Sequence, residues 1–238
     1  MIRVGHLRYE ELGELIARVG DVKSLKTGID PLDRFLGGFK TGFIYEISGP
    51  PASGKSWLAH KLLASSLLSS GGDLVECGAV YVDSGKQFDV RLLSQMLSGD
   101  QSDLKRVHVM RGVDHPRRLE RVLRRIRDLA EDVDVRLIII DEFPEAISKS
   151  EGKAKMYDLA PELLRALLNV SKLSSELNSC VLLINRAYKS ALTGSFRSFG
   201  WGLTGSFCHY RAFMHKISGE VLFELFSPPL GGISLKLG

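Results

Sequence analysis

The stretch that decides the fold is Gly49-Pro50-Pro51-Ala52-Ser53-Gly54-Lys55-Ser56, which follows the apolar run Ile44–Ser48. It matches G-x-x-x-x-G-K-[ST], a glycine-rich turn between a β-strand and a helix. The next segment, Trp57–Ser70, has the leucine spacing of an amphipathic helix. Backbone N–H groups in such a turn, together with the helix N-terminus, attract phosphate. The pattern therefore predicts a nucleotide site in which these eight residues and Trp57 bind phosphate.

Specific roles follow from the side chains of this motif. Lys55 is expected to reach the β- and γ-phosphates, and the Ser56 hydroxyl to ligate Mg²⁺. A second metal ligand is expected from the segment Arg136–Glu142, a buried parallel strand that ends in an acid. Ligands of parallel sheets bind at the carboxyl ends of the strands, so Asp141 fits the role of the Mg²⁺-holding carboxylate. The alternative is a strand that merely ends in a solvated acid.

Length and composition indicate one large domain, or one domain with a small appendage. The chain has 238 residues, of which 44% are apolar and 25% charged, and a formal charge of +4 that permits a polyanion partner. Its three cysteines form no C-x-x-C pair, which suits a reducing compartment and argues against a zinc site. We find neither a signal peptide nor an apolar run of spanning length, so we expect no membrane association and a cytoplasmic protein, or a nuclear one in a eukaryote.

Strands and helices alternate along the chain, which predicts an α/β fold with a mostly parallel central sheet flanked by helices. The expected strands are Ile44–Ser48, Ala79–Asp83, Val107–Met110, Arg136–Glu142 and Cys180–Asn185. The expected helices are Trp57–Ser70, Phe88–Leu97, Arg117–Leu129 and Leu159–Leu177, the last with Pro161 in its first turn. Three late strands, His209–Ile217, Val221–Ser227 and Ile233–Leu237, predict an antiparallel C-terminal extension.

The helix Arg117–Leu129 carries six arginines opposite its apolar side. One interpretation is a surface that contacts phosphates. The other is a solvated helix face, partly paired with Glu120 and Asp128, and the sequence alone favours it.

The segment Thr27-Gly28-Ile29-Asp30-Pro31-Leu32-Asp33-Arg34-Phe35-Leu36-Gly37-Gly38, followed by a glycine turn, a strand and the phosphate loop, resembles the RecA/RadA recombinase superfamily. The resemblance implies a RecA-like ATP-binding core over residues 27–238, preceded by an N-terminal arm of residues 1–26. It also implies ATP and Mg²⁺ as cofactors. The helical N-terminal DNA-binding domain of full recombinases has no counterpart here, so the chain resembles a short paralogue, such as archaeal RadB and the eukaryotic recombinase paralogues.

Two departures from the family pattern concern hydrolysis. In the family a catalytic glutamate follows the second strand, and here Gly85 stands in its place. We therefore expect slow hydrolysis, with Glu142 as a substitute base. Lys55 is the other expected catalytic residue. The family's γ-phosphate-sensing glutamine is replaced by Arg186, which is expected to bind nucleotide or to leave the switch uncoupled.

Two further departures concern assembly. The family's polymerisation motif falls near Tyr9-Glu10-Glu11-Leu12, where Leu12 would not fit a pocket built for alanine. Ser227-Pro228-Pro229-Leu230 resembles the segment that lies near a neighbouring subunit's nucleotide, but Gly231-Gly232 follows it in place of Pro-Glu. We therefore do not expect the chain to form filaments by itself.

Single-stranded DNA is the expected nucleic-acid partner, through the two loops that follow Asp141 and Asn185 in the family. Basic groups interleaved with aromatic rings suit this role, and two ordinary solvated loops are the alternative. The candidate residues are Lys149, Lys153 and Lys155 in the first loop, and Tyr188, Lys189, Phe196, Arg197 and Phe199 in the second, expected over Tyr188–Gly200.

The resulting hypothesis is an ATP-binding recombinase paralogue in homologous recombination and DNA repair. It would assist or regulate the main recombinase or another paralogue, bind single-stranded DNA and hydrolyse ATP weakly. Three alternatives remain open: a true DNA-stimulated ATPase, a non-catalytic adaptor that uses ATP as a structural ligand, and a clock-protein or replicative-helicase type of RecA-like ATPase.

Overall fold

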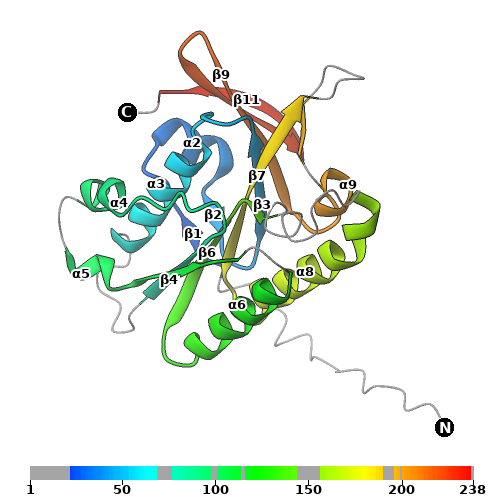
Figure 1. Ribbon diagram of the computed structural model, residues 1–238. Helices are drawn as coiled ribbons and strands as arrows, with labels where there is room; N and C mark the ends of the chain where they lie inside the picture. The colour runs from blue at the N-terminus through cyan, green and yellow to red at the C-terminus, as the bar shows by residue number, and fades with distance from the viewer. Residues whose placement is uncertain are drawn as a thin grey trace.

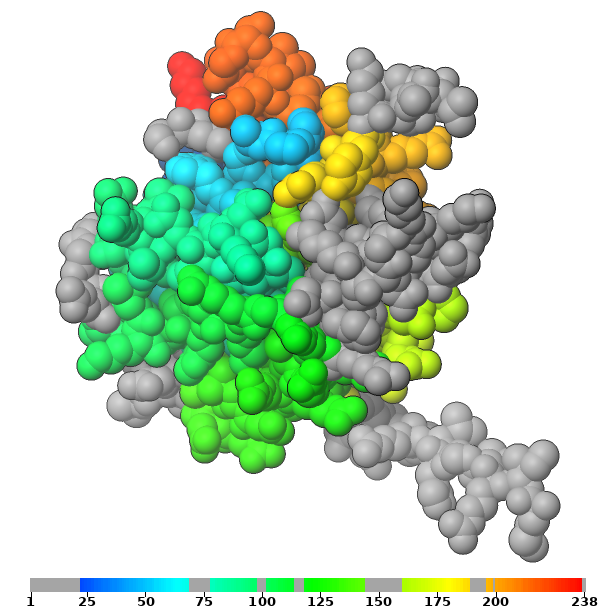
Figure 2. Space-filling model, in the orientation of Figure 1, coloured from blue at the N-terminus to red at the C-terminus, as the bar shows by residue number. Residues whose placement is uncertain are grey.

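The computed structural model describes residues 22–68, 77–97, 101–113, 116–143, 156–189, 196–198 and 200–236. Figure 1 shows one central sheet with helices on both of its faces. Figure 2, in the same orientation, shows the hairpin of residues 210–227 in orange at the top of this face and residues 118–129 in green lower down. The predicted arm helix near Tyr9 and the predicted division at residue 27 fall largely outside the described residues and stay predictions.

The main sheet has the spatial order β11-β10-β9-β3-β7-β6-β4-β5, with β8 beside β7. Its strands are β3 (Ile44–Gly49), β4 (Cys77–Asp83), β5 (Val107–Arg111), β6 (Asp134–Asp141), β7 (Cys180–Lys189), β8 (Phe196–Ser198), β9 (Tyr210–Ile217), β10 (Glu220–Ser227) and β11 (Pro229–Leu235). A separate small sheet pairs β1 (Ser24–Leu25) with β2 (Phe39–Lys40).

The predicted fold class is confirmed, with one difference at the start of the C-terminal extension. Strands β3 to β7 of the main sheet pair in parallel, whereas β10 and β11 pair antiparallel. Strand β9, expected as part of the antiparallel extension, instead runs parallel to β3 and antiparallel only to β10. The chain re-enters the sheet next to β3 after α9 (Trp201–Thr204), so the change of direction begins one strand later than predicted.

Helices cover both faces of the sheet. On one side lie α2 (Asp30–Leu36), α3 (Lys55–Leu68), α4 (Val90–Met96) and α5 (Gln101–Leu104), and on the other α6 (Pro116–Leu129) and α8 (Met156–Glu176) (Figure 1). Helix α8 begins earlier than predicted, so Pro161 lies inside it rather than in its first turn, and its missing N–H removes one backbone hydrogen bond. None of these helices, within the described part of the chain, has both the length and the apolar character needed to cross a bilayer.

The central strands are buried on both faces, which explains their continuous apolar runs. In β6, Leu137 and Ile139 belong to the core beneath α3, whereas Ile138 and Ile140 belong to the core beneath α6 and α8. Full burial of such a side chain contributes roughly 1.5–3 kcal/mol. This double burial holds the carboxyl end of β6 rigidly in the middle of the sheet.

The segment that begins at Thr27 is held against α2 by hydrogen bonds to the Asp33 side chain. The carboxylate of Asp33 accepts hydrogen bonds from the Thr27 N–H (2.8 Å), the Thr27 hydroxyl (2.9 Å) and the Gly28 N–H (3.0 Å). Helix α2 then ends at Gly37, which adopts the left-handed conformation (φ 71°) that terminates helices. These hydrogen bonds fix the path of the chain ahead of β3 and of the loop that follows β3.

Candidate functional site

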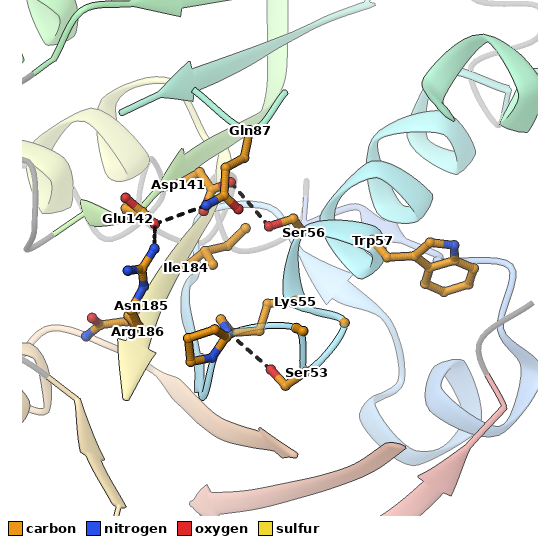
Figure 3. Close-up of a pocket in the computed structure, with 13 residues that line it drawn as sticks. Ser53, Lys55, Ser56, Trp57, Gln87, Asp141, Glu142, Ile184, Asn185 and Arg186 are labelled. Atoms are coloured by element: carbon orange, nitrogen blue, oxygen red, sulfur yellow. Dashed lines mark hydrogen bonds and ion pairs between the residues drawn. The ribbon is translucent and has the colours of Figure 1, made fainter. Parts of the chain in front are cut away.

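A cavity of about 300 Å³ lies at the carboxyl ends of β3 and β6 and beside the middle of β7 (Figure 3). Its walls come from the loop after β3, the start of α3, the segment after β4, the end of β6 and the middle of β7. The residues that line it are Pro51, Ala52, Ser53, Gly54, Lys55, Ser56, Trp57, Gln87, Asp141, Glu142, Ile184, Asn185 and Arg186. All the predicted cofactor-binding residues except Gly49 and Pro50 are among them. Figure 3 shows the Trp57 ring turned away from the carboxylates.

The loop is shaped by glycine at its first position and by left-handed residues further on. A methyl group at Gly49 would lie 2.1 Å from the Met214 carbonyl oxygen, so only glycine fits where β9 passes behind the loop. Ala52 (φ 59°) and Gly54 (φ 97°) are left-handed, and they turn the chain into α3. Backbone N–H groups at this helix start give the cavity a partial positive charge.

The Lys55 ammonium group lies against the loop itself. Its Nζ donates hydrogen bonds to the carbonyl oxygens of Gly49 (2.9 Å) and Pro50 (2.7 Å), and to the Ser53 hydroxyl (3.1 Å). This places a full positive charge beside the N-terminus of α3. The arrangement suits an anion with several oxygens, because such a ligand can replace the carbonyl acceptors.

Two oxygen-bearing side chains face each other across the cavity. The Ser56 hydroxyl lies 3.5 Å from Asp141 Oδ2, and the same oxygen accepts a 2.6 Å hydrogen bond from the Tyr81 hydroxyl. Asp141 is 1% exposed, and this burial raises the pKa of its carboxyl group, while the Tyr81 hydrogen bond lowers it. A hydroxyl and a carboxylate are hard oxygen ligands, so this donor pair fits Mg²⁺.

Glu142 is aimed into the same cavity as Asp141, although neighbouring strand residues point to opposite faces. Strand β6 ends at Asp141, and Glu142 has a left-handed backbone (φ 58°) that redirects its side chain. Its carboxylate accepts a hydrogen bond from Gln87 Nε2 (3.3 Å) and forms an ion pair with Arg186 (Figure 3). The end of the strand therefore brings two carboxylates together.

The Glu142 carboxyl group can occupy its position because Gly85 has no side chain. A methyl group at position 85 would lie 2.8 Å from Glu142 Cδ and 3.0 Å from Glu142 Oε2. The first distance is too short for a nonbonded contact, and the second is shorter than most. The Glu142 side chain thus occupies the space into which a side chain at position 85 would extend.

The second predicted loop is partly a β-hairpin, so that prediction is corrected. Tyr188 and Lys189 end β7, and they pair antiparallel with Arg197 and Phe196 of β8. The hairpin forms because β7 runs on past the end of β6, with Ala187 packed in the interior. The Tyr188, Phe196 and Arg197 side chains are exposed. Lys149, Lys153, Lys155 and Phe199, and the side chain of Lys189, lie outside the described residues.

A buried carboxylate that the sequence did not suggest connects the cavity to this hairpin. Glu46, in the middle of β3, accepts hydrogen bonds from Asn185 (2.8 Å), Ser198 (3.1 Å) and Thr204 (3.0 Å) and from Arg211 Nε (2.7 Å). Glu46 sits inside an apolar run, so no local signal marked it. Tyr81 and Gln87 were missed because their partners, Asp141 and Glu142, are distant in sequence.

Comparison with known proteins identifies the chain at the level of the family. The family model described as Rad51 matches residues 18–200, more than half of the chain. The chain belongs to the Rad51 family. Its membership of the RecA/RadA recombinase superfamily, predicted from the Thr27–Ser56 region, is thereby confirmed.

Curated relatives of this Rad51-family chain include archaeal and bacterial proteins. It is 27% identical to the DNA repair and recombination protein RadA of Methanocorpusculum labreanum, over 91% of this chain and 73% of that protein. It is 24% identical to the RadA protein of Aeropyrum pernix, over 70% of this chain and 54% of that protein. It is 27% identical to Protein RecA of Chlamydia trachomatis, over 70% of this chain and 45% of that protein. The matched region thus spans about half the length of the second and third relatives.

Proposed function

We propose that this chain is an ATP-binding recombinase paralogue that acts in homologous recombination and DNA repair beside the main recombinase or another paralogue. The observation that carries the proposal is the cavity that gathers Lys55, Ser56 and Asp141 at the carboxyl edge of the sheet. The names of the RadA and RecA relatives supply the biological setting. Such a role fits a location wherever DNA is kept, the cytoplasm or a nucleus.

The loop residues would hold the nucleotide. Backbone N–H groups of Ser53 to Ser56 would cradle the phosphates, and Lys55 would exchange its carbonyl acceptors for phosphate oxygens. Ser56 and Asp141 would hold Mg²⁺, which neutralises charge that develops on the phosphates. Tyr81 would orient the Asp141 carboxylate through its 2.6 Å hydrogen bond.

Glu142 would be the general base in place of the missing glutamate at position 85. It lines the cavity, and Gln87 and Arg186 orient its carboxylate. The same ion pair occupies the carboxylate, so Arg186 competes with a water molecule for the Glu142 oxygens. We therefore propose a weak ATPase, with Arg186 positioned to contact either Glu142 or a phosphate.

Single-stranded DNA would bind the β7–β8 hairpin. Its exposed side chains combine two rings, Tyr188 and Phe196, with the guanidinium group of Arg197. Rings that stack on bases and cations that contact phosphates form the usual platform for single strands. Glu46 bonds Asn185 of the cavity and Ser198 of the hairpin at once, which gives nucleotide and DNA a shared support.

The test is single-turnover ATP hydrolysis, with and without single-stranded DNA, in the wild type, Glu142→Gln and the matched control Glu131→Gln on the exposed end of the α6 region. Loss of a general base lowers the rate by about 10²–10⁴-fold. We expect that loss in Glu142→Gln alone, with ATP binding retained. Equal rates in all three proteins would contradict the role of Glu142.

The same measurements separate the alternatives. ATP binding without any turnover in the wild type would indicate a non-catalytic adaptor. Fast, strongly DNA-stimulated turnover would indicate a working ATPase of RecA type. Hexameric rings in light scattering would indicate the clock-protein or helicase type and contradict the paralogue proposal.

A further inference from the structure

A second cavity, of about 430 Å³, lies where the end of β5 meets α6, and five arginines line it. They are Arg111, Arg118, Arg121, Arg124 and Arg125. The remaining wall is made of Gly112, Val113 and Val122, so none of the described residues that line the cavity is acidic. The cavity is larger than the candidate nucleotide site and has a strongly positive wall.

The helical period explains how one helix supplies four of these arginines. The apolar side of α6, which includes Leu119, Leu123 and Ile126, is buried beneath the sheet. Arg118, Arg121 and Arg125 follow at intervals of three and four residues, so they lie above one another on an exposed side. Like charges at these intervals repel each other, and the cluster therefore costs the isolated helix stability.

The rim of the cavity is fixed by contacts with buried or backbone groups. Arg111 Nε lies 3.4 Å from Oδ2 of Asp83, a residue that is 1% exposed. Arg118 Nη1 donates a 3.1 Å hydrogen bond to the Gly112 carbonyl oxygen, and Gly112 turns the chain with φ 76°. By contrast, Arg127 pairs with Glu176 on α8 (2.8 Å) and does not line the cavity. Arg127 thus contacts a neighbouring helix, apart from the five arginines of the cavity, and the solvated face partly paired with Glu120 and Asp128 stays the alternative for those exposed on α6.

The position of the cavity relates it to the candidate nucleotide site. Strand β4 lies between β6 and β5, and Asp83 is the register partner of both Asp141 and Arg111. Two strand spacings correspond to about 10 Å. The arginine cavity is therefore a neighbour of the first cavity on the same edge of the sheet, and it belongs to neither the nucleotide loop nor the β7–β8 hairpin.

We propose that this cavity binds the phosphate backbone of a DNA strand. Guanidinium groups match phosphate with two parallel hydrogen bonds each, and five of them exceed what one phosphate needs. From Arg118 to Arg125 the helix rises about 10 Å. That length corresponds to about three nucleotides of one strand. The valine and glycine walls offer no side-chain donors or acceptors, so the arginines make the contacts, and contacts to phosphate carry no sequence information.

The choice of DNA among polyanions rests on the proposed role in recombination. An acidic protein segment is the competing ligand, since carboxylates also pair with arginine. The experiment therefore uses two probes, a fluorescein-labelled oligothymidine and a fluorescein-labelled poly-L-glutamate, and follows the fluorescence anisotropy of each over a series of salt concentrations.

The variant to test is Arg121→Gln with Arg125→Gln, because both side chains are exposed and glutamine preserves the helix. Removing two phosphate contacts on a single strand should reduce the slope of log affinity against log salt by about 1.4. A matched control, Arg34→Gln with Arg91→Gln, removes the same charge from exposed positions outside the cavity and should leave the slope unchanged. The charge-preserving variant Arg121→Lys with Arg125→Lys should restore most of the slope. Unchanged circular dichroism melting establishes that the variants are folded.

Four results would overturn the proposal, and the first two concern the cavity variant. In the first, the cavity variant and the matched control have the same DNA affinity and salt slope. In the second, poly-L-glutamate binds the wild type but not the cavity variant, while DNA binding is equal in both. An Arg197→Gln variant distinguishes the two proposed DNA contacts. If this variant loses DNA binding and the cavity variant does not, the hairpin proposal stands and the cavity proposal fails. If the wild type binds no DNA at all, both fail.

Discussion

Replacing Gly85 with alanine adds one methyl group at the point where Glu142 needs space. That methyl group would lie 2.8 Å from Glu142 Cδ, whereas ordinary contact begins at 3.4 Å. The φ of Gly85 lies outside the left-handed region, so the alanine backbone itself is unstrained. The displaced group is therefore the Glu142 carboxyl, which must move away from position 85.

The size of the effect follows from that displacement. The contact must lengthen by at least 0.6 Å, the difference between 3.4 and 2.8 Å. A misplacement of 1 Å in a catalytic group costs about 100-fold in rate, so 0.6 Å corresponds to about 10- to 20-fold. Affinity for ATP should change little, because Gly85 does not line the cavity.

The assay is single-turnover ATP hydrolysis, combined with calorimetric titration of ATP binding. Gly202→Ala is the matched control, since a methyl group at Gly202 meets no atom within 4 Å. The double variant Gly85→Ala with Glu142→Gln tests the cause. If alanine acts by moving Glu142, it should add no further loss once the carboxylate is gone.

Two outcomes would refute this reasoning. Wild-type turnover in Gly85→Ala would mean that the exact place of the Glu142 carboxyl does not matter for hydrolysis. An equal loss with and without Glu142 would mean that position 85 affects turnover by another route.

Three further predictions concern the framework of the site. Arg211→Met should lower the free energy of unfolding by about 3–5 kcal/mol in urea denaturation, because it leaves the Glu46 carboxylate buried without its cation; a loss below 1 kcal/mol would show that the other donors suffice. Gly49→Ala should destabilise the protein by about 1–3 kcal/mol, through overlap with the Met214 carbonyl oxygen 2.1 Å away, and an unchanged melting temperature would contradict that overlap. Burial lowers the pKa of His209, whose Nδ1 accepts a hydrogen bond from the Ile44 N–H of β3. The contribution of His209 to the free energy of unfolding should therefore be complete above pH 6.5 and decrease as the pH falls through the lowered pKa. His209→Gln should flatten that part of the pH profile.

The sequence by itself determined the strand, loop and helix around Lys55, and the strands and helices of the parallel core. These features were predictable because their signals are contiguous: a motif of eight residues, apolar runs such as that of β6, and leucines at helical spacing. Position along a parallel strand also placed Asp141 correctly at the edge of the cavity.

Only the tertiary structure decided how the side chains meet. Glu46 is tolerated in a buried strand because groups from three other strands and a helix bond it. Glu142 enters the cavity because its backbone turns left-handed and Gly85 leaves room. The arginines of α6 form a cavity only because β5 ends beside them. The Glu46 and Glu142 arrangements join residues distant along the chain, and since such contacts arise from packing rather than from local periodicity, no single stretch of sequence carries their signal. The arginines lie within one stretch and were visible as one side of a helix, but the cavity beside them depends on how α6 packs against the end of β5.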